Sequence, residues 1–265
     1  MCTVLVRFDP TAAWPILLAA VRDEFMQRAW DPPAAHWPEM PTVTGGRDRV
    51  AGGTWMAVKA ALENTAGSRP AIAALLNGVR LGDPEDGSTR PTRGRLVLEA
   101  LSASDFRHDS VPGAGMLGPA GELAQYDGFH LLRADATGVQ LWSWDGVELS
   151  HRQLDPGNHI IVNLGADRDE DPLVPHFRPL LEATPDPVLA ESADTSAAWG
   201  SWVDLLRGDG LALDDPRGLI IEHFYGGRHY GSTSASLVGL AADGRVRYDF
   251  TATPQAADWH RVAVV

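Results

Sequence analysis

Short runs of apolar residues near the start of the chain predict two buried strands. The runs cover residues 2–7 and 15–21, and the turn-like sequence "DPTAAW" separates them. A strand and its short return normally pair side by side, so we expect two adjacent antiparallel strands. This pairing would bring Cys2 to the same end of the sheet as Arg22 and Asp23, which directly follow the second run.

Further apolar runs predict strands in the middle and at the end of the chain. The pair Asp145-Gly146 has the composition of a hairpin turn, and residues 234–252 read as a second hairpin that turns at Asp243-Gly244. The other predicted strands are residues 54–58, 70–79, 128–135, 139–144, 147–151 and 159–165.

Three segments have apolar residues at helical spacing. They are residues 88–103, where a threonine is available as a cap, residues 171–184, and residues 195–208 with Trp199 and Trp202. Strands grouped at the start, middle and end, with helices between, favour α+β layers over a strict βαβ alternation. No internal repeat or low-complexity linker divides the chain, so we expect one domain over residues 1–265.

Composition and charge narrow the class of protein. The formal net charge of −13 argues against nucleic acid or an anionic membrane as the main partner. A single cysteine excludes an intramolecular disulfide and any zinc site with two cysteines. The longest apolar run, residues 15–21, is too short to span a bilayer, and the first residues do not resemble a signal peptide. We therefore expect a soluble, cytoplasmic protein without integral membrane association.

Nine tryptophans are many for 265 residues. Most should pack in the core, whereas some could line a pocket for a flat or apolar ligand. Trp30 and Trp37 lie in a segment, residues 30–41, that is too proline-rich for a regular core element. We take Trp30, Trp37 and Trp55 as candidate ligand-binding residues, and we expect the segment to line the mouth of the cleft that contains Cys2.

Glycine and histidine patterns give weaker signals. The glycine pairs at 45–46 and 52–53 lack the features of a phosphate-binding loop, and tight turns explain them better. Glu222, His223 and His229 lie close in sequence, but their spacing matches no standard zinc pattern. We predict no metal site.

Cys2 directly follows the first methionine and is the chain's single thiol. Its position could be chance. Alternatively, removal of Met1 would leave a thiol and a free α-amine on one residue, which then carries a nucleophile and its own base. The charged residues that follow the second strand also have two interpretations. Either the strand simply ends there, or Arg22 and Asp23 belong to a functional site beside Cys2.

Several segments together resemble the NRDE family, also called the transport and Golgi organisation family. They are "MCTVLVRFDP", "VRDEF", "GGRDRVAGGTWMAV", "RGRLVLEALS", "GFHLLRAD" and "YGSTSASLV", and the likeness extends from residue 1 to about residue 251. The resemblance implies a fold like that of N-terminal-nucleophile hydrolases. This would be an α+β, four-layer αββα sandwich, with two antiparallel sheets stacked between helix layers.

The resemblance also implies roles for particular residues. In bile-salt hydrolases and penicillin V acylases, which have the implied fold, an N-terminal cysteine attacks an amide. The matching positions are Cys2 as nucleophile and base, Arg22 and Asp23 near its amine, Asn77 as oxyanion donor, and Asn163 on a later strand. An α-amine titrates near ~7.7–8.0 and a thiol near ~8.5, so proton exchange between them is nearly balanced.

Two positions depart from the family pattern. Val21 replaces the asparagine of the NRDE sequence, and Thr233 stands where an arginine is expected. That arginine would be a natural anchor for an active-site carboxylate or an anionic ligand. We therefore expect weak or absent turnover of bile-salt and penicillin-type amides.

Two functions remain in view, beside a third interpretation in which the protein is a degenerate scaffold whose pocket is only structural. One is a cysteine hydrolase, active or degenerate, that cleaves a small amide. The other is a non-catalytic binding or trafficking protein for an acyl or other hydrophobic ligand, with haem as a possible cargo, because the family has been linked to haem mobilisation and acyl-lipid metabolism. Neither function requires a cofactor.

Overall fold

The computed structural model describes residues 2–62, 68–82, 90–102, 123–190, 193–256 and 258–265. Its contacts divide into two compact units. The first unit comprises Met1–Arg28 and Pro156–Ala263, and the second comprises Ala29–Asp155 and Val264–Val265. Each unit contains one sheet, and the expectation of a single domain over residues 1–265 stays a prediction.

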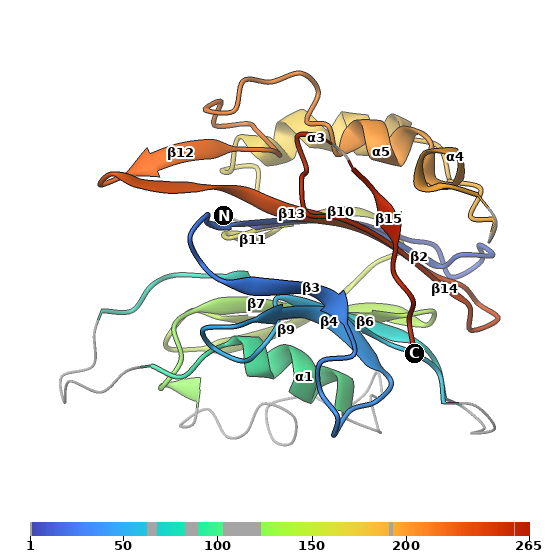
Figure 1. Ribbon diagram of the computed structural model, residues 1–265, viewed down its shortest axis with the longest axis horizontal. Helices are drawn as coiled ribbons and strands as arrows, with labels where there is room; N and C mark the ends of the chain where they lie inside the picture. Colours follow the sequence, from blue (N-terminus) through green and yellow to red (C-terminus); the bar gives the residue numbers. More distant parts are fainter. Residues whose placement is uncertain (1, 63–67, 83–89, 103–122, 191–192, 257) are drawn as a thin grey trace. The chain divides into compact units, whose positions relative to one another are not determined.

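The sheet of the first unit has the order β11-β10-β1-β2-β13-β14-β15, with β12 paired to β13 (Figure 1). Its strands are β1 (Thr3–Phe8), β2 (Ile16–Phe25), β10 (Gly157–Val162), β11 (Gly165–Ala166), β12 (Glu222–Tyr225), β13 (Arg228–Leu240), β14 (Val246–Thr251) and β15 (His260–Arg261). The predicted antiparallel pair is confirmed, because β1 and β2 run in register from Thr3 opposite Val21 to Phe8 opposite Ile16. Consecutive residues of β1 are buried, which is why this central strand reads as an unbroken apolar run.

Three helices cover one face of this sheet: α3 (Leu173–Ala183), α4 (Thr195–Trp199) and α5 (Ser201–Leu205) (Figure 1). The predicted helix at 195–208 is split at Gly200, whose φ of 51° is incompatible with a continuing helix. The Asp194 side chain caps α4 by accepting a hydrogen bond from the backbone N–H of Ala197. None of the helices in the described part of the chain is long and apolar enough to cross a membrane.

A buried ion pair attaches α4 to the sheet. Arg247 and Asp249 both lie on β14, and their side chains approach to 2.6 Å. The Asp249 carboxylate also accepts hydrogen bonds from the Thr195 hydroxyl and the Trp199 indole. Such a network is favourable in the interior only because every charged atom finds a partner there.

The sheet of the second unit is an antiparallel meander in the chain order β3 to β9. Its strands are β3 (Trp30–Ala34), β4 (Val43–Asp48), β5 (Met56–Lys59), β6 (Ala71–Asn77), β7 (Phe129–Asp135), β8 (Gly138–Trp144) and β9 (Leu149–Leu154). Helix α1 (Gly94–Ser102) packs on one face through buried Leu96, Val97, Ala100 and Leu101 (Figure 1). Thr92 accepts a hydrogen bond from Gly94 N–H, so a threonine supports the start of this helix as predicted.

The first glycine pair lies within strand β4, so its interpretation as a tight turn is wrong. The reason is close packing: a β-carbon at Gly46 would lie 2.2 Å from the Trp55 ring, and one at Gly45 would lie 2.6 Å from the Ala57 side chain. The second pair does begin at a turn, because Gly52 has a φ of +78°. Gly53 has no side chain, so the start of α1 can lie close to its backbone. At this contact Gly94 C=O accepts a hydrogen bond from Thr54 N–H.

We expect Gly53→Ala to destabilise the protein by about 1–3 kcal/mol. The added β-carbon would lie 2.5 Å from a backbone atom of Gly94, so α1 would have to shift. Urea unfolding measures the change. Gly82→Ala is the control, because nothing lies within 4 Å of a β-carbon at that glycine. Equal stability of Gly53→Ala and the wild type would show that this close approach is not required.

The expected α+β, four-layer αββα sandwich is wrong, because the protein is β-rich. About 40% of the structure is strand and 14% is helix, and the strands form two mostly antiparallel sheets. Two local causes explain the error. Glycine- and proline-rich segments such as Trp30–Ala34 and Val43–Asp48 form strands, whereas the predicted helices are shortened or split.

Candidate functional site

Cys2 lies immediately before strand β1, next to Asn163. Its backbone N–H donates a hydrogen bond of 3.1 Å to Asn163 Oδ1. Strand pairing explains the contact: β1 and β10 run antiparallel with Val4 opposite Ile161, and the same register continued by two residues brings Cys2 opposite Asn163. The structure thus brings together two of the residues that the sequence singled out.

The thiol of Cys2 points toward strand β2. Its Sγ lies 3.9 Å from the carbonyl oxygen of Asp23, at the long limit of a weak S–H hydrogen bond. Burial raises the pKa of the Cys2 thiol, and the neighbouring Asp23 carboxyl adds to this effect. At neutral pH the residue is therefore a thiol, and it needs a base to become a nucleophile.

Asp23 is buried at the same end of the sheet, with 6% of its surface exposed. Its carboxyl accepts a hydrogen bond of 2.6 Å from the Ser232 hydroxyl, and its backbone carbonyl accepts one of 3.1 Å from the Tyr230 hydroxyl. Burial raises the pKa of the Asp23 carboxyl to about 7. A carboxyl that titrates near neutral pH beside a thiol is typical of a functional site.

Arg22 is equally buried and is held by a bulge in strand β13. The pairing of β13 with β2 shifts between Ser232 and Ser234, which leaves Thr233 as the extra residue. The Thr233 hydroxyl accepts a hydrogen bond of 2.8 Å from Arg22 Nη1 and also contacts the Arg22 carbonyl oxygen at 3.2 Å. The threonine that replaces the expected arginine is thus a direct partner of Arg22.

We expect Thr233→Val to destabilise the protein by about 1–3 kcal/mol. Valine has nearly the same shape, but it removes the acceptor for Arg22 Nη1 in a site where Arg22 is only 5% exposed. Thr233→Ser is the matched control, because it keeps the hydroxyl. Urea unfolding of both variants checks the prediction, and wild-type stability of Thr233→Val would show that the hydroxyl contact to Arg22 is not required.

Ser232, Thr233 and Tyr230 were missed as partners of the site, although they belong to the sequence "YGSTSAS". A run of small hydroxyl residues in a buried strand was the available signal. Buried hydroxyls need partners, so such a run facing "VRDEF" indicates a polar network rather than a plain core. Val21, the other departure from the family pattern, is 2% exposed and packs in the apolar core of the first unit.

Asn77 ends strand β6 in the second unit, and its side chain is exposed. Its role as an oxyanion donor stays a prediction.

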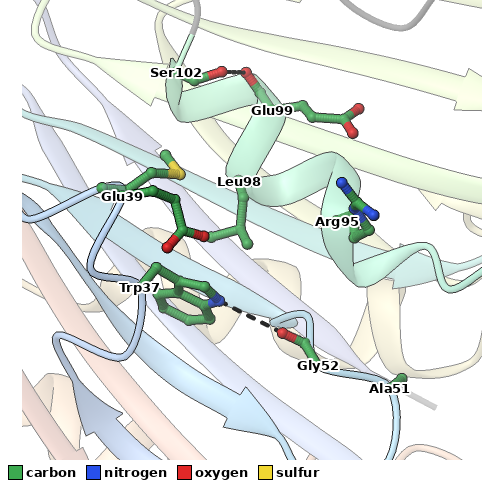
Figure 2. Close-up of a pocket in the computed structure, with 9 residues that line it drawn as sticks. Trp37, Glu39, Ala51, Gly52, Arg95, Leu98, Glu99 and Ser102 are labelled. Atoms are coloured by element: carbon green, nitrogen blue, oxygen red, sulfur yellow. Dashed lines mark hydrogen bonds between the residues drawn. The ribbon is translucent and has the colours of Figure 1, made fainter.

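The three candidate ligand-binding tryptophans all lie in the second unit. Trp30 and Trp55 contact each other edge to face, with ring centroids 5.7 Å apart. Trp37 is 6% exposed and belongs to the core of this unit, but it also lines a hollow of about 500 Å³. Figure 2 shows this hollow, and its lining residues come from the second unit alone. The expectation that residues 30–41 line a cleft containing Cys2 stays a prediction.

The histidines near residue 225 have partners of their own. His229 Nε2 lies 2.7 Å from Glu222 Oε1 across the β12–β13 hairpin, and the His229 ring stacks on Phe224. Within the described ranges, no group of three or more histidine, cysteine or acidic side chains is arranged to hold a metal ion.

Comparison with known proteins agrees with the resemblance in the sequence. A family model described as Transport and Golgi organisation 2 matches residues 1–195, a range that contains Cys2, Arg22, Asp23 and Asn163. No curated protein matches the chain significantly. The match covers most of the 265 residues, and the chain belongs to the Transport and Golgi organisation 2 family.

Proposed function

We propose that this protein is a cysteine hydrolase of the N-terminal-nucleophile type that cleaves a small linear amide. The observation that carries the proposal is the placement of Cys2. Its backbone nitrogen is bound by Asn163, and its thiol lies against Asp23, beside a buried arginine. A nucleophile held next to titratable and charged groups is the arrangement that covalent catalysis needs.

The chemistry requires that Met1 be removed, so that the nitrogen of Cys2 becomes a free amine. The amine takes the thiol proton as Sγ attacks the amide carbonyl carbon. The Sγ–C bond forms, the C–N bond breaks, and the proton passes to the leaving amine. Water then cleaves the thioester, which releases the acid and restores the thiol.

The surrounding residues have supporting roles in this proposal. Asn163 Oδ1 accepts an N–H of the amine and so directs its lone pair. Arg22 favours the negative charge that develops on sulfur, because a nearby cation stabilises an anion in a poorly solvated site. Asn77 is the proposed oxyanion donor, and donors of this kind contribute roughly 10²–10³ in rate.

Mass spectrometry tests the proposal in two steps. The intact mass of protein purified from its own host establishes whether Met1 is removed. The processed protein is then incubated with activated esters and simple amides, and an acyl adduct is sought on the peptide that begins with Cys2. An adduct with turnover supports the proposal. A processed protein that never acquires an acyl group contradicts it.

The hollow beside Trp37 favours a second candidate function, the binding or transport of a hydrophobic ligand. An aromatic wall in a preformed hollow is typical of small-molecule sites. In this proposal the ligand is an acyl compound or haem, carried as cargo rather than as a cofactor. Quenching of tryptophan fluorescence by haem or a fatty acid, compared between the wild type and Trp37→Phe, tests it. Identical quenching in the two proteins would rule out the hollow as the binding site.

A further inference from the structure

The hollow of the second unit has two walls of different origin. One wall is a single stripe of α1, formed by residues spaced i, i+3, i+4 and i+7: Arg95, Leu98, Glu99 and Ser102 (Figure 2). The loop before β4 supplies the other wall, with Trp37, Glu39 and Met40. The Ala51-Gly52 turn completes the lining.

The apolar part of the lining lies in the middle of the hollow. Leu98 projects from α1 between the two walls, and Trp37 faces it from the loop (Figure 2). The Trp37 indole is fixed by its packing and by a long hydrogen bond of 3.5 Å from its N–H to the Gly52 carbonyl. A rigid aromatic ring beside leucine and methionine forms a surface for an alkyl or aryl group.

The charges of the lining do not cancel. Arg95 and Glu99 are four residues apart on one face of α1, where opposite charges attract. Burial raises the pKa of Glu99, and Arg95 partly offsets this effect. One arginine therefore stands against two glutamates, so the lining has a net negative charge, and Glu39 lies on the loop wall next to the apolar residues.

We propose that this hollow binds an organic monocation with an apolar body, such as an alkylammonium ion. The apolar body packs against Trp37, Met40 and Leu98, and the ammonium group lies at the exposed rim beside Glu39. The indole contributes further, because aromatic rings attract cations that lose part of their water. The inference rests on the hollow of the ligand-binding candidate above, but it assigns that hollow a cationic ligand in place of an acyl compound or haem, and it is independent of chemistry at Cys2.

Isothermal titration calorimetry with octylammonium and octanoate at pH 7.5 tests the proposal. The two probes have similar apolar chains and opposite charge. We expect the wild type to bind octylammonium more tightly than octanoate. Glu39→Lys should weaken octylammonium binding by about tenfold and should favour octanoate, because the charge at the rim is reversed. Glu148→Lys is the matched control, since it makes the same charge change at an exposed position of the same unit outside the lining.

The remaining outcomes separate the possible failures. Tighter binding of octanoate than of octylammonium would overturn the proposed ligand class but would keep a ligand site in the hollow. An equal effect of Glu39→Lys and Glu148→Lys would overturn the site itself, because only general charge would matter. Cys2→Ala should bind octylammonium as the wild type does, so that loss of hydrolase chemistry and loss of this site remain distinguishable. Both charge variants change exposed side chains, and unfolding curves confirm that they are folded.

Discussion

Cys2→Ala is expected to abolish the acyl adduct and to lower amide turnover by at least about 10³-fold. Alanine keeps the small size of the residue and the backbone contact to Asn163, but it removes the sulfur that forms the covalent bond. The adduct is measured by mass spectrometry, and turnover is measured by release of the amine.

Cys2→Ser provides the graded comparison. A hydroxyl is a much weaker nucleophile than a thiol near neutral pH, so turnover should fall severely. It should not vanish, because serine still supplies an oxygen nucleophile. The intact mass of each variant must first show the same N-terminus as the wild type, because a retained Met1 would remove the free amine in any of them. Wild-type turnover in Cys2→Ala would place the chemistry elsewhere. If the wild type forms no acyl adduct but still binds a hydrophobic ligand, the second candidate function is favoured.

The pairing of Cys2 with Arg22 and Asp23 was predictable because it depends on neighbouring segments. Two apolar runs joined by a short turn pair side by side, and the length of the turn sets which of their residues face each other. The contact of Cys2 with Asn163 was different. It joins residues 161 positions apart, and the resemblance to a family suggested it where periodicity alone could not.

The network around Arg22 was not predictable in the same way. Thr233 reaches Arg22 only because β13 contains a bulge at that point, and nothing in the local sequence distinguishes a bulge from a regular strand there. Thr233 was therefore regarded as the loss of an arginine. In the structure it is a hydrogen-bonding partner of Arg22, so the site keeps this arginine although the second expected arginine is replaced.

The error in fold class has the same physical origin as the missed strands. Propensity assigns glycine and proline to turns, but a glycine within a strand also permits close packing, as Gly46 does under the Trp55 ring. Proline is tolerated in β3 because this strand lies at the edge of its sheet, where one side needs no ladder hydrogen bonds. Tertiary contacts therefore determined the secondary structure of these segments, and their local composition did not.

Asp23→Asn is expected to remove a pH dependence from the stability of the protein. The pKa of Asp23 is raised from 3.8 to about 7, so the folded protein keeps this proton to a higher pH than the unfolded chain does. The free energy of unfolding of the wild type should therefore fall as the pH rises from about 4 to about 7, by up to about 1.4 kcal/mol per pH unit. Asparagine is never charged, and its Oδ1 still accepts from Ser232, so the variant should lose this decline.

Urea unfolding at several pH values between 4 and 8 measures the effect, and Asp215→Asn is the control with the opposite sign. Arg217 holds the pKa of Asp215 down, at about 2, so the stabilisation from Asp215 is constant above about pH 4 and is lost only in more acidic solution. Removing Asp215 should lower stability while the decline between pH 4 and 7 persists. The same decline in Asp23→Asn as in the wild type would show that Asp23 is not the group that titrates. Loss of the decline in Asp23→Asn alone would establish that a buried carboxyl beside the Cys2 thiol changes charge near neutral pH, where an amidase would have to work.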